Sequence, residues 1–324
     1  MALEARTFHP EAWLLLAETA QAAGDVAMAR ECAARARQLV PHWRAAKRFH
    51  KALPSRGRVS NVRWPALPAK AGQPRLTIFV IAKNEEKFLG QCLDSVRGLA
   101  DQLIVVDTGS TDSTVEIAKM RGAEVYSHPW EDDFSAARNA ALAHAAGDWV
   151  MFLDADEELP ACEHAKLRAD MASADVLAVR LRLQNVGQEE DGQCYVPRLW
   201  RNAPGLFFHG RVHEQVFPSI LVKCEAWGME TRLGTATLRH HGYSAEVIAD
   251  RNKIERNLRL LRQAIEELPG EPMLLMNLGL ELVRSGQLRE GLEHYRSAFS
   301  QLAGLPKKDV VPELREALLT QYVC

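Results

Sequence analysis

The chain has 324 residues, with 40 lysines and arginines against 42 aspartates and glutamates, so its formal net charge is −2. An apolar fraction of 47% and a charged fraction of 25% are ordinary for a globular protein, and the length allows two or three domains. The balanced charge argues against a nucleic-acid partner. No apolar stretch reaches the length of a membrane span, and the amino terminus lacks the apolar core of a secretory signal.

The cysteines are scattered along the chain and none forms a Cys-x-x-Cys pair, which argues against a zinc site and against a small disulfide scaffold. Reduced thiols, and with them a cytoplasmic location, are expected. The six positions are Cys32, Cys92, Cys162, Cys194, Cys224 and Cys324.

Residues 1–52 are predicted to be helical. Between Pro10 and Pro41 small residues recur at helical spacing, Gly24 marks a turn and Pro41 ends the pattern, which resembles the 34-residue tetratricopeptide repeat. The same register recurs at residues 278–298, inside a second helical segment predicted for residues 246–324. Because three repeats are normally needed for a solenoid, each segment would pack on the central domain or bind a protein partner. A plain helical hairpin is the alternative.

Residues 53–74 are rich in proline and glycine and are predicted to form a linker. This region is also basic, because no acidic residue stands between Glu31 and Glu85 while twelve lysines and arginines do. Such a stretch could meet an anionic partner or the inner face of a membrane. The alternatives are a solvated face, or docking on acidic segments of the same chain.

Residues 75–245 alternate between predicted strands and helices, which indicates a mostly parallel sheet with helices on both faces. The apolar runs predict strands at 76–81, 102–107, 124–126 and 148–153, with helices at 113–121 and 135–146. Later strands are predicted at 176–184, 195–201 and 233–239, and helix returns after Ser244. The fold class is therefore α/β, flanked by helical segments.

Four motifs follow the ends of predicted elements in this domain, at residues 82–86, 105–112, 130–139 and 154–157. Asp154 and Asp156, at the end of a buried strand, could hold one Mg²⁺ or Mn²⁺ ion. A nucleotide would bind at that edge of the sheet. Alternatively, one of these aspartates caps a helix that begins near Pro160. Asp107 could accept hydrogen bonds from a nucleotide, or form a turn with Gly109.

Together the motifs Lys-Asn-Glu-Glu, Asp-Thr-Gly-Ser-x-Asp, Trp-x-x-Asp-Phe-x-x-x-Arg-Asn and Leu-Asp-Ala-Asp-Glu resemble the inverting family-2 glycosyltransferases with a GT-A fold. The similarity is to a bacterial branch that includes lipopolysaccharide-core glucosyltransferases and peptide S-glycosyltransferases, often with tetratricopeptide-like helices. The resemblance implies a UDP-sugar donor and a Mn²⁺ or Mg²⁺ cofactor. The donor site it implies consists of Ile81, Ala82, Asn84, Glu86, Asp107, Arg138 and Asp154.

The same resemblance assigns roles to residues in the second half of the domain. Asp156 would ligate the metal, and Glu214, in a motif Arg-x-His-Glu-Gln, would be the general base. Alternatively Glu214 pairs with Arg211 or His213. In a motif His-x-Gly-Tyr the match assigns the further metal ligand to His240, with His241 at a variable position.

The implied reaction is a single displacement with inversion, assisted by the metal. The acceptor would be an envelope saccharide, a lipid-linked sugar or a peptide. No phosphate-binding Gly-x-x-x-x-Gly-Lys-Ser/Thr loop is present. The alternative function is a non-catalytic adaptor that holds a nucleotide and binds a protein through its terminal helices.

Overall fold

The computed structural model describes residues 6, 8–55, 60–64, 66–67, 72–187, 194–241 and 251–304. The chain divides into two compact units. The first unit contains residues 1–130, 137–208 and 216–243, and the second contains residues 131–136, 209–215 and 244–324. The four-part division expected from the sequence stays a prediction.

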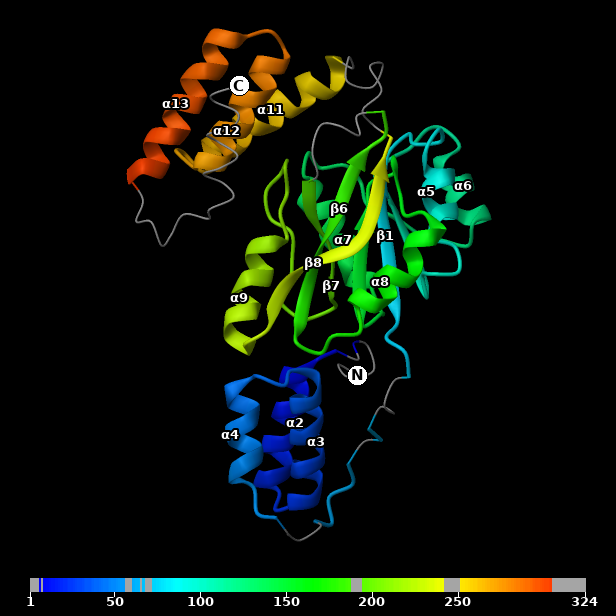
Figure 1. Cartoon of the computed structure of the whole chain (residues 1–324), viewed down its shortest axis with the longest axis vertical. Helices are drawn as coiled ribbons and strands as arrows, with labels where there is room; N and C mark the ends of the chain where they lie inside the picture. The colour runs from blue at the N-terminus through cyan, green and yellow to red at the C-terminus, as the bar shows by residue number, and fades with distance from the viewer. Residues whose placement is uncertain are drawn as a thin grey trace. The chain divides into compact units, whose positions relative to one another are not determined.

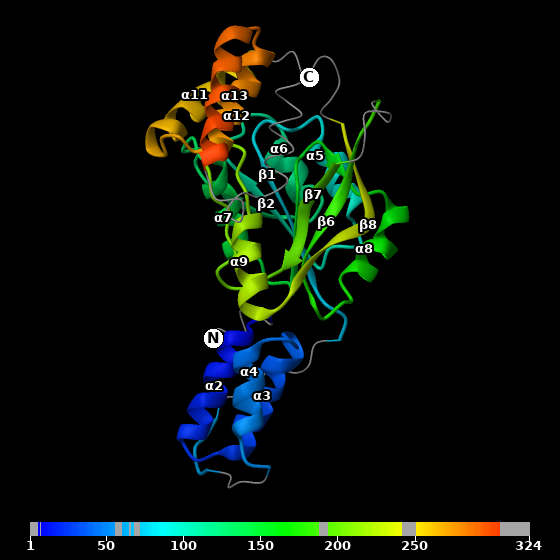
Figure 2. The same cartoon turned by 60° about the vertical axis from the view of Figure 1, so that its left-hand side comes forward.

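The amino-terminal part of the first unit contains three helices, α2 (Pro10–Ala22), α3 (Val26–Leu39) and α4 (Arg44–Ala52), which lie side by side in Figures 1 and 2. Alanines at the α2–α3 contact are fully buried, and small side chains allow two helices to approach closely. Asp25 caps α3, because its carboxylate accepts a hydrogen bond from the Met28 amide at 3.0 Å. The same carboxylate accepts one from Trp64 Nε1 at 3.0 Å, which ties the predicted linker to these helices.

An eight-stranded sheet forms the centre of the first unit, in the order β3-β2-β1-β4-β7-β6-β8-β5. One half is parallel and consists of β1 (Leu76–Ala82), β2 (Gln102–Asp107), β3 (Glu124–Ser127) and β4 (Trp149–Leu153). The other half is mixed and consists of β5 (Glu157–Glu158), β6 (Val176–Asn185), β7 (Cys194–Arg201) and β8 (Glu230–His240).

Four of the pairings between described strands are parallel and three are antiparallel, so the sheet is mixed with parallel pairing in the majority, in line with the expected mostly parallel sheet. Strand β7 pairs antiparallel with both β4 and β6, and β5 pairs antiparallel with β8. Strand β7 is the next described element after β6, and antiparallel pairing needs no crossover helix between two such strands.

Helices cover both faces of the sheet, as predicted (Figures 1 and 2). On one face Ile78 and Val80 pack with α5 (Leu89–Ser95), α6 (Thr114–Met120) and α8 (His164–Asp170). On the other face Phe79 packs with α7 (Phe134–His144) and α9 (Phe217–Trp227). This alternation along β1 places apolar side chains on both sides, as expected for a strand buried on both faces. The sequence patterns had not indicated α5 or α9.

The second unit contains α11 (Arg251–Glu267), α12 (Pro272–Arg284) and α13 (Leu288–Gly304). Helices α12 and α13 approach closely at two glycines. A Cβ on Gly291 would lie 2.8 Å from the carbonyl oxygen of Gly279, a distance that real Cβ atoms do not show. Leu275, Met276 and Tyr295 are among the residues of the hydrophobic core between these helices.

The helices in the described part of the chain span no more than 17 residues. None of them combines the length and the apolar character that crossing a membrane requires.

Candidate functional site

The loops that follow β1 and β2 are joined at the carboxyl edge of the sheet. The Asn84 amide donates to Ser110 Oγ at 2.9 Å, and Asn84 Oδ1 accepts from the Thr111 amide at 2.8 Å. Asn84 has a φ of 56°, a left-handed conformation that asparagine tolerates better than most residues. Its side chain therefore fixes the shape of this loop pair.

Glu86 makes a second connection between the same loops. Its carboxylate accepts from the Ser113 amide at 3.1 Å, and its own amide donates to Asp112 at 3.2 Å. The carbonyl oxygen of Ala82 accepts from the Thr108 amide at 2.9 Å, and Ile81 is half-buried beside it. The four predicted donor-site residues Ile81, Ala82, Asn84 and Glu86 therefore lie together. The side chains of Asn84 and Glu86 form hydrogen bonds within the protein.

Asp107 ends β2 and shapes the turn after it. Its carboxylate accepts from the amides of Gly109 at 3.2 Å and Ser110 at 3.1 Å. Gly109 has a φ of 103°, which side-chain-bearing residues rarely adopt. The turn that the sequence left open as an alternative is thus present. A carboxylate has about four lone-pair sites, so this turn leaves acceptor capacity for a ligand.

Asp154, at the end of β4, is held by two arginines. Arg138 Nη2 lies 2.8 Å from one carboxylate oxygen, and Arg198 Nη2 lies 2.8 Å from the other. Both guanidinium groups lie over the Phe152 ring, at 4.2 and 4.0 Å from its centroid. Burial works to raise the pKa of Asp154, but the two adjacent cations outweigh it and hold that pKa well below its ordinary value.

Arg198 and Glu157 belong to this cluster, although the sequence had assigned no role to Glu157 of the motif at 154–157 and had not indicated Arg198. Arg198 also pairs with Glu157, whose Oε2 accepts from the Asp154 amide at 3.1 Å. Both side chains are nearly inaccessible, and burial raises the pKa of Glu157. An arginine inside an apolar strand was the available signal, because a buried guanidinium requires a carboxylate partner.

Asp156 and His240 lie next to each other because β5 pairs with β8, with Glu157 opposite His240. The Asp156 carboxylate and His240 Nε2 are 3.4 Å apart, and both side chains are about one-fifth exposed. His240 Nδ1 lies 3.1 Å from Asn185 Oδ1, which orients the ring with Nε2 toward Asp156. The tertiary structure therefore brings together the two residues predicted as metal ligands.

His241 belongs to a different cluster. Its Nε2 lies 3.4 Å from the Glu158 carboxylate and 3.2 Å from Nε2 of the Gln91 side chain. Gln91 Nε2 also donates a hydrogen bond to the Glu158 carboxylate at 2.7 Å. The other half of the His-x-Gly-Tyr motif, residues 242–243, lies outside the described residues.

The capping role that the sequence left open for Asp154 or Asp156 is absent where it was expected. The short 3-10 helix Ala161–Glu163 follows Pro160 and leads into α8, and neither has a side-chain cap hydrogen bond. Among the residues that the structure describes, no group of three or more His, Cys, Asp or Glu side chains is arranged to hold a metal. Asp156 and His240 would thus be two protein ligands, with the remaining positions open to substrate or water.

Glu214 lies in the second unit, in the loop of residues 209–215. The backbones of His209 and Gln215 exchange hydrogen bonds of 3.1 and 2.9 Å, which closes this loop. Arg211, one of the alternative partners of Glu214, forms an ion pair with Glu267 at 2.8 Å. His213 is almost buried, and this burial lowers its pKa.

The model of "Glycosyl transferase family 2" matches residues 77–224. This stretch contains β1 from its second residue, all of β2 to β7, and the residues around Asp154 and Asp156. The chain carries a family-2 glycosyltransferase domain. The match confirms the predicted family for this part of the molecule, and the mixed sheet with helices on both faces confirms its α/β class.

Two curated relatives extend the likeness of the family-2 domain. A TPR repeat-containing protein of Synechococcus elongatus is 34% identical over 247 residues, which cover 75% of this chain and 60% of that protein. The SPbeta prophage-derived glycosyltransferase SunS of Bacillus subtilis is 27% identical over 235 residues, covering 71% of this chain and 54% of SunS. The chain thus spans less than two thirds of these relatives.

Solved structures of two other proteins resemble the chain. TarS of S. aureus, residues 1–349 with UDP-GlcNAc, has a TM-score of 0.46 and 17% identity, covering 76% of this chain and 89% of TarS. Glucosyl-3-phosphoglycerate synthase of Mycobacterium tuberculosis, with Mn²⁺ and UDP-glucose, has a TM-score of 0.43 and 19% identity, covering 59% and 79%. Likeness at this level carries no argument about the site.

Proposed function

We propose that the protein is a metal-dependent, inverting glycosyltransferase that moves a sugar from a UDP-sugar to an acceptor. The observation that carries this proposal is the pairing of β5 with β8, which sets the Asp156 carboxylate 3.4 Å from His240 Nε2 at the carboxyl end of β4. Ligands of open α/β sheets bind at this end of the strands. Asp156 lies inside the matched family-2 stretch, and His240 lies 16 residues beyond its last residue, 224.

The arrangement of Asp156 and His240 fits a divalent cation. Metal-binding histidines normally bond through their second ring nitrogen to a neighbouring acceptor, as His240 does to Asn185. One carboxylate and one imidazole suit Mn²⁺ better than Mg²⁺, which prefers oxygen ligands alone. A cation held there would stabilise the negative charge of the departing UDP as a Lewis acid.

Asp154 would then bind the sugar donor and would not ligate the metal directly. Each of its oxygens accepts from an arginine, so the carboxylate is ionised and fixed in position. Its side chain is 35% exposed, which leaves an edge for a ribose hydroxyl or a bound water. Arg138, in the motif that resembles a uridine-binding region, would hold this carboxylate in register with the donor.

Inversion follows from a base on the opposite side of the sugar. Glu214 would accept the proton of the acceptor group as that group forms its bond to the anomeric carbon, while the bond from that carbon to UDP breaks. The electron pair of the broken bond leaves with UDP. The sequence motif Arg-x-His-Glu-Gln supports this role for Glu214.

Charge on the amino-terminal helices favours an anionic acceptor. Helix α4 carries Arg44, Lys47, Arg48 and Lys51 at helical spacing of 0, 3, 4 and 7, and all four are exposed. Among the residues that the structure describes, no carboxylate forms an ion pair with any of these four side chains. This face would attract an acidic saccharide, a phosphorylated lipid-linked sugar or an anionic membrane surface. Anionic acceptors are therefore the first class to screen.

The test is release of UDP from a panel of UDP-sugars with Mn²⁺ and candidate acceptors, together with direct measurement of Mn²⁺ binding. Asp156→Asn should lower turnover on the order of 100-fold, because charge on the leaving group loses its counterpart. Asp94→Asn, which removes the exposed partner of Arg121, is the control and should behave as the native protein. Unchanged turnover in Asp156→Asn would reject the metal site, and partner capture without any UDP release would favour the adaptor.

A further inference from the structure

Two motif loops from distant parts of the sequence contact each other in the second unit. Residues 131–136 carry the Trp-x-x-Asp-Phe motif, and residues 209–215 carry the motif with Glu214. The Phe134 amide donates to the carbonyl oxygen of Arg211 at 2.8 Å, which joins the loops through their backbones. A change in the conformation of one loop would therefore reach the other.

Each loop contains a non-glycine residue in the left-handed region. Asp132 has a φ of 58° and His213 a φ of 53°. Such conformations cost backbone energy and persist only where surrounding contacts fix them. The question is which part of the chain supplies these contacts.

Helix α11 supplies the charged contacts to both motif loops. Arg259 forms two hydrogen bonds with the Asp132 carboxylate, of 2.6 and 2.7 Å. Glu267, two turns further along the same helix, accepts from Arg211 Nε at 3.0 Å and from Nη2 at 2.8 Å. Both pairs have the two-pronged geometry in which a guanidinium fixes the orientation of a carboxylate.

Contacts other than ion pairs also reach the same loops from α11 and α12. The Arg256 guanidinium lies 5.1 Å from the centroid of the Phe134 ring. Gln215 Nε2 lies 2.7 Å from the sulfur of Met273, at the start of α12. Each loop is thus held at two or more points by helices that follow the family-2 domain in sequence.

We infer that α11 and α12 are part of the transfer machinery, with Arg259 and Glu267 as positioning residues that fix the two motif loops. This inference rests on the proposed function, because it assigns the loop containing Glu214 a role in transfer. It adds that residues outside the family-2 match set the rate of the reaction. Misplacement of a reacting group by about 1 Å can lower a rate 100-fold.

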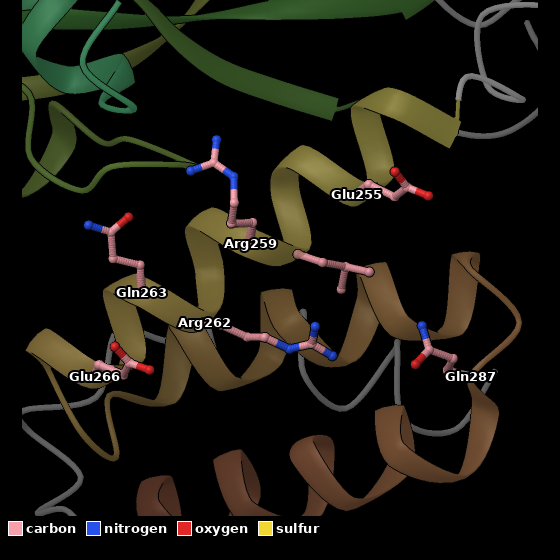
Figure 3. A pocket seen from close by; sticks show the side chains of 7 residues that line it. Glu255, Arg259, Arg262, Gln263, Glu266 and Gln287 are labelled. Carbon is pink, nitrogen blue, oxygen red and sulfur yellow. The ribbon is translucent and has the colours of Figure 1, made fainter.

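Arg262 provides a matched control. It lies on the same helix as Arg259 and pairs with Glu290 of α13 at 3.5 Å rather than with a motif loop. Figure 3 shows the two arginines leaving α11 in different directions. Both line an open pocket with Glu255, Leu258, Gln263, Glu266 and Gln287. Removing either charge changes this pocket, but only Arg259 touches a motif loop.

The first experiment measures steady-state transfer in Arg259→Gln, Arg259→Lys and Arg262→Gln. Arg259→Gln should lower kcat about 10-fold or more with the KM for donor changed less than about 3-fold, because the loop and not the donor site is released. Arg259→Lys should recover part of kcat, and Arg262→Gln should match the native protein. The melting temperature should move by about 2 °C at most, since the Arg259 and Asp132 side chains are 55% and 36% exposed. A native kcat in Arg259→Gln would overturn the inference.

The second experiment is hydrogen exchange of residues 131–136 and 209–215 in the same variants, which needs no substrate. Exchange in both segments should become faster in Arg259→Gln and remain native in Arg262→Gln. Unchanged exchange in Arg259→Gln would overturn the inference even if transfer were observed. If the native protein released no UDP from any donor, the proposed function would fail, while the exchange data would still decide whether the helices hold the loops.

Discussion

The amino-terminal and carboxyl-terminal helical segments have similar sequence patterns but different places in the molecule. In the first unit Phe8 and Val40 lie in the same hydrophobic core as Phe79 of the central strand β1. In the second unit α12 and α13 pack on each other around Gly279 and Gly291. Both segments have a core of their own, but the amino-terminal one also extends the core of the sheet, whereas the carboxyl-terminal one holds two motif loops.

The difference shows what a helical repeat pattern can and cannot predict. The small residues of such a pattern specify how two helices approach each other, which is a local property. Where the hairpin then docks depends on large apolar side chains near its ends. Phe8 and Trp43 both pack on Trp227 of α9, with ring centroids 6.1 and 6.2 Å away.

The largest effect is expected where the amino-terminal segment shares the core of the sheet. Phe8→Ala should reduce the free energy of unfolding of the first unit by about 4 kcal/mol, because the buried ring leaves a cavity beside Trp227. All seven tryptophans lie in the first unit, so their fluorescence during urea unfolding reports on it alone. Leu15→Ala, at a side chain that is 64% exposed on α2, is the control. An unchanged midpoint in Phe8→Ala would show that the segment folds independently.

A smaller effect is expected in the second unit. Gly291→Ala should destabilise the α12–α13 hairpin by about 2 kcal/mol, since the new Cβ would clash with the Gly279 carbonyl oxygen and with Val283. Amide exchange in α12 and α13 should become faster while the tryptophan unfolding midpoint stays native. A shift of that midpoint as large as that in Phe8→Ala would remove the contrast between the two segments.

The smallest effect is expected for an ion pair between the amino-terminal helices and α9. Lys223 Nζ lies 2.7 Å from Glu11 on α2, and Glu11 is 40% exposed. Lys223→Met should cost at most about 1 kcal/mol by the same fluorescence measurement, because exposed ion pairs are weak and methionine keeps the packing on Trp227. A loss comparable to that in Phe8→Ala would mean that charge, rather than the aromatic contact, attaches the segment.

Much of the fold could be predicted because its elements have strong local signals. The strands of residues 76–81, 102–107 and 176–184 were predicted within one residue of their observed ends. Helices α5 and α9 were missed, whereas α6, which is as short as α5, was predicted, so helix length alone does not decide whether a periodic pattern is recognised. The antiparallel pairing of β7 with β4 joins residues 48 to 52 positions apart in sequence, from Met151–Leu199 to Trp149–Arg201, and no local pattern encodes it.

The candidate site was predictable to the extent that motifs identify residues, and their roles remain proposals. The motifs indicated Asp154, Asp156 and His240, but not that Arg138 and Arg198 would occupy both oxygens of Asp154. The carboxylate partners of Arg198 could not be predicted, because strand direction and register decide which carboxylate this side chain meets. The contact of Arg259 with Asp132 could not be predicted either, since it joins residues 127 positions apart in sequence.

The sequence by itself determined which residues are candidates for the proposed chemistry, because motif spacing and strand ends are properties of short segments. Only the tertiary structure decided which residues contact each other. The β5–β8 pairing places Asp156 beside His240. Helix α11 forms ion pairs with two loops that lie far from it in the chain. Contacts of this kind arise from packing and from pairing between remote segments, whose energies depend on the whole fold rather than on neighbours in sequence.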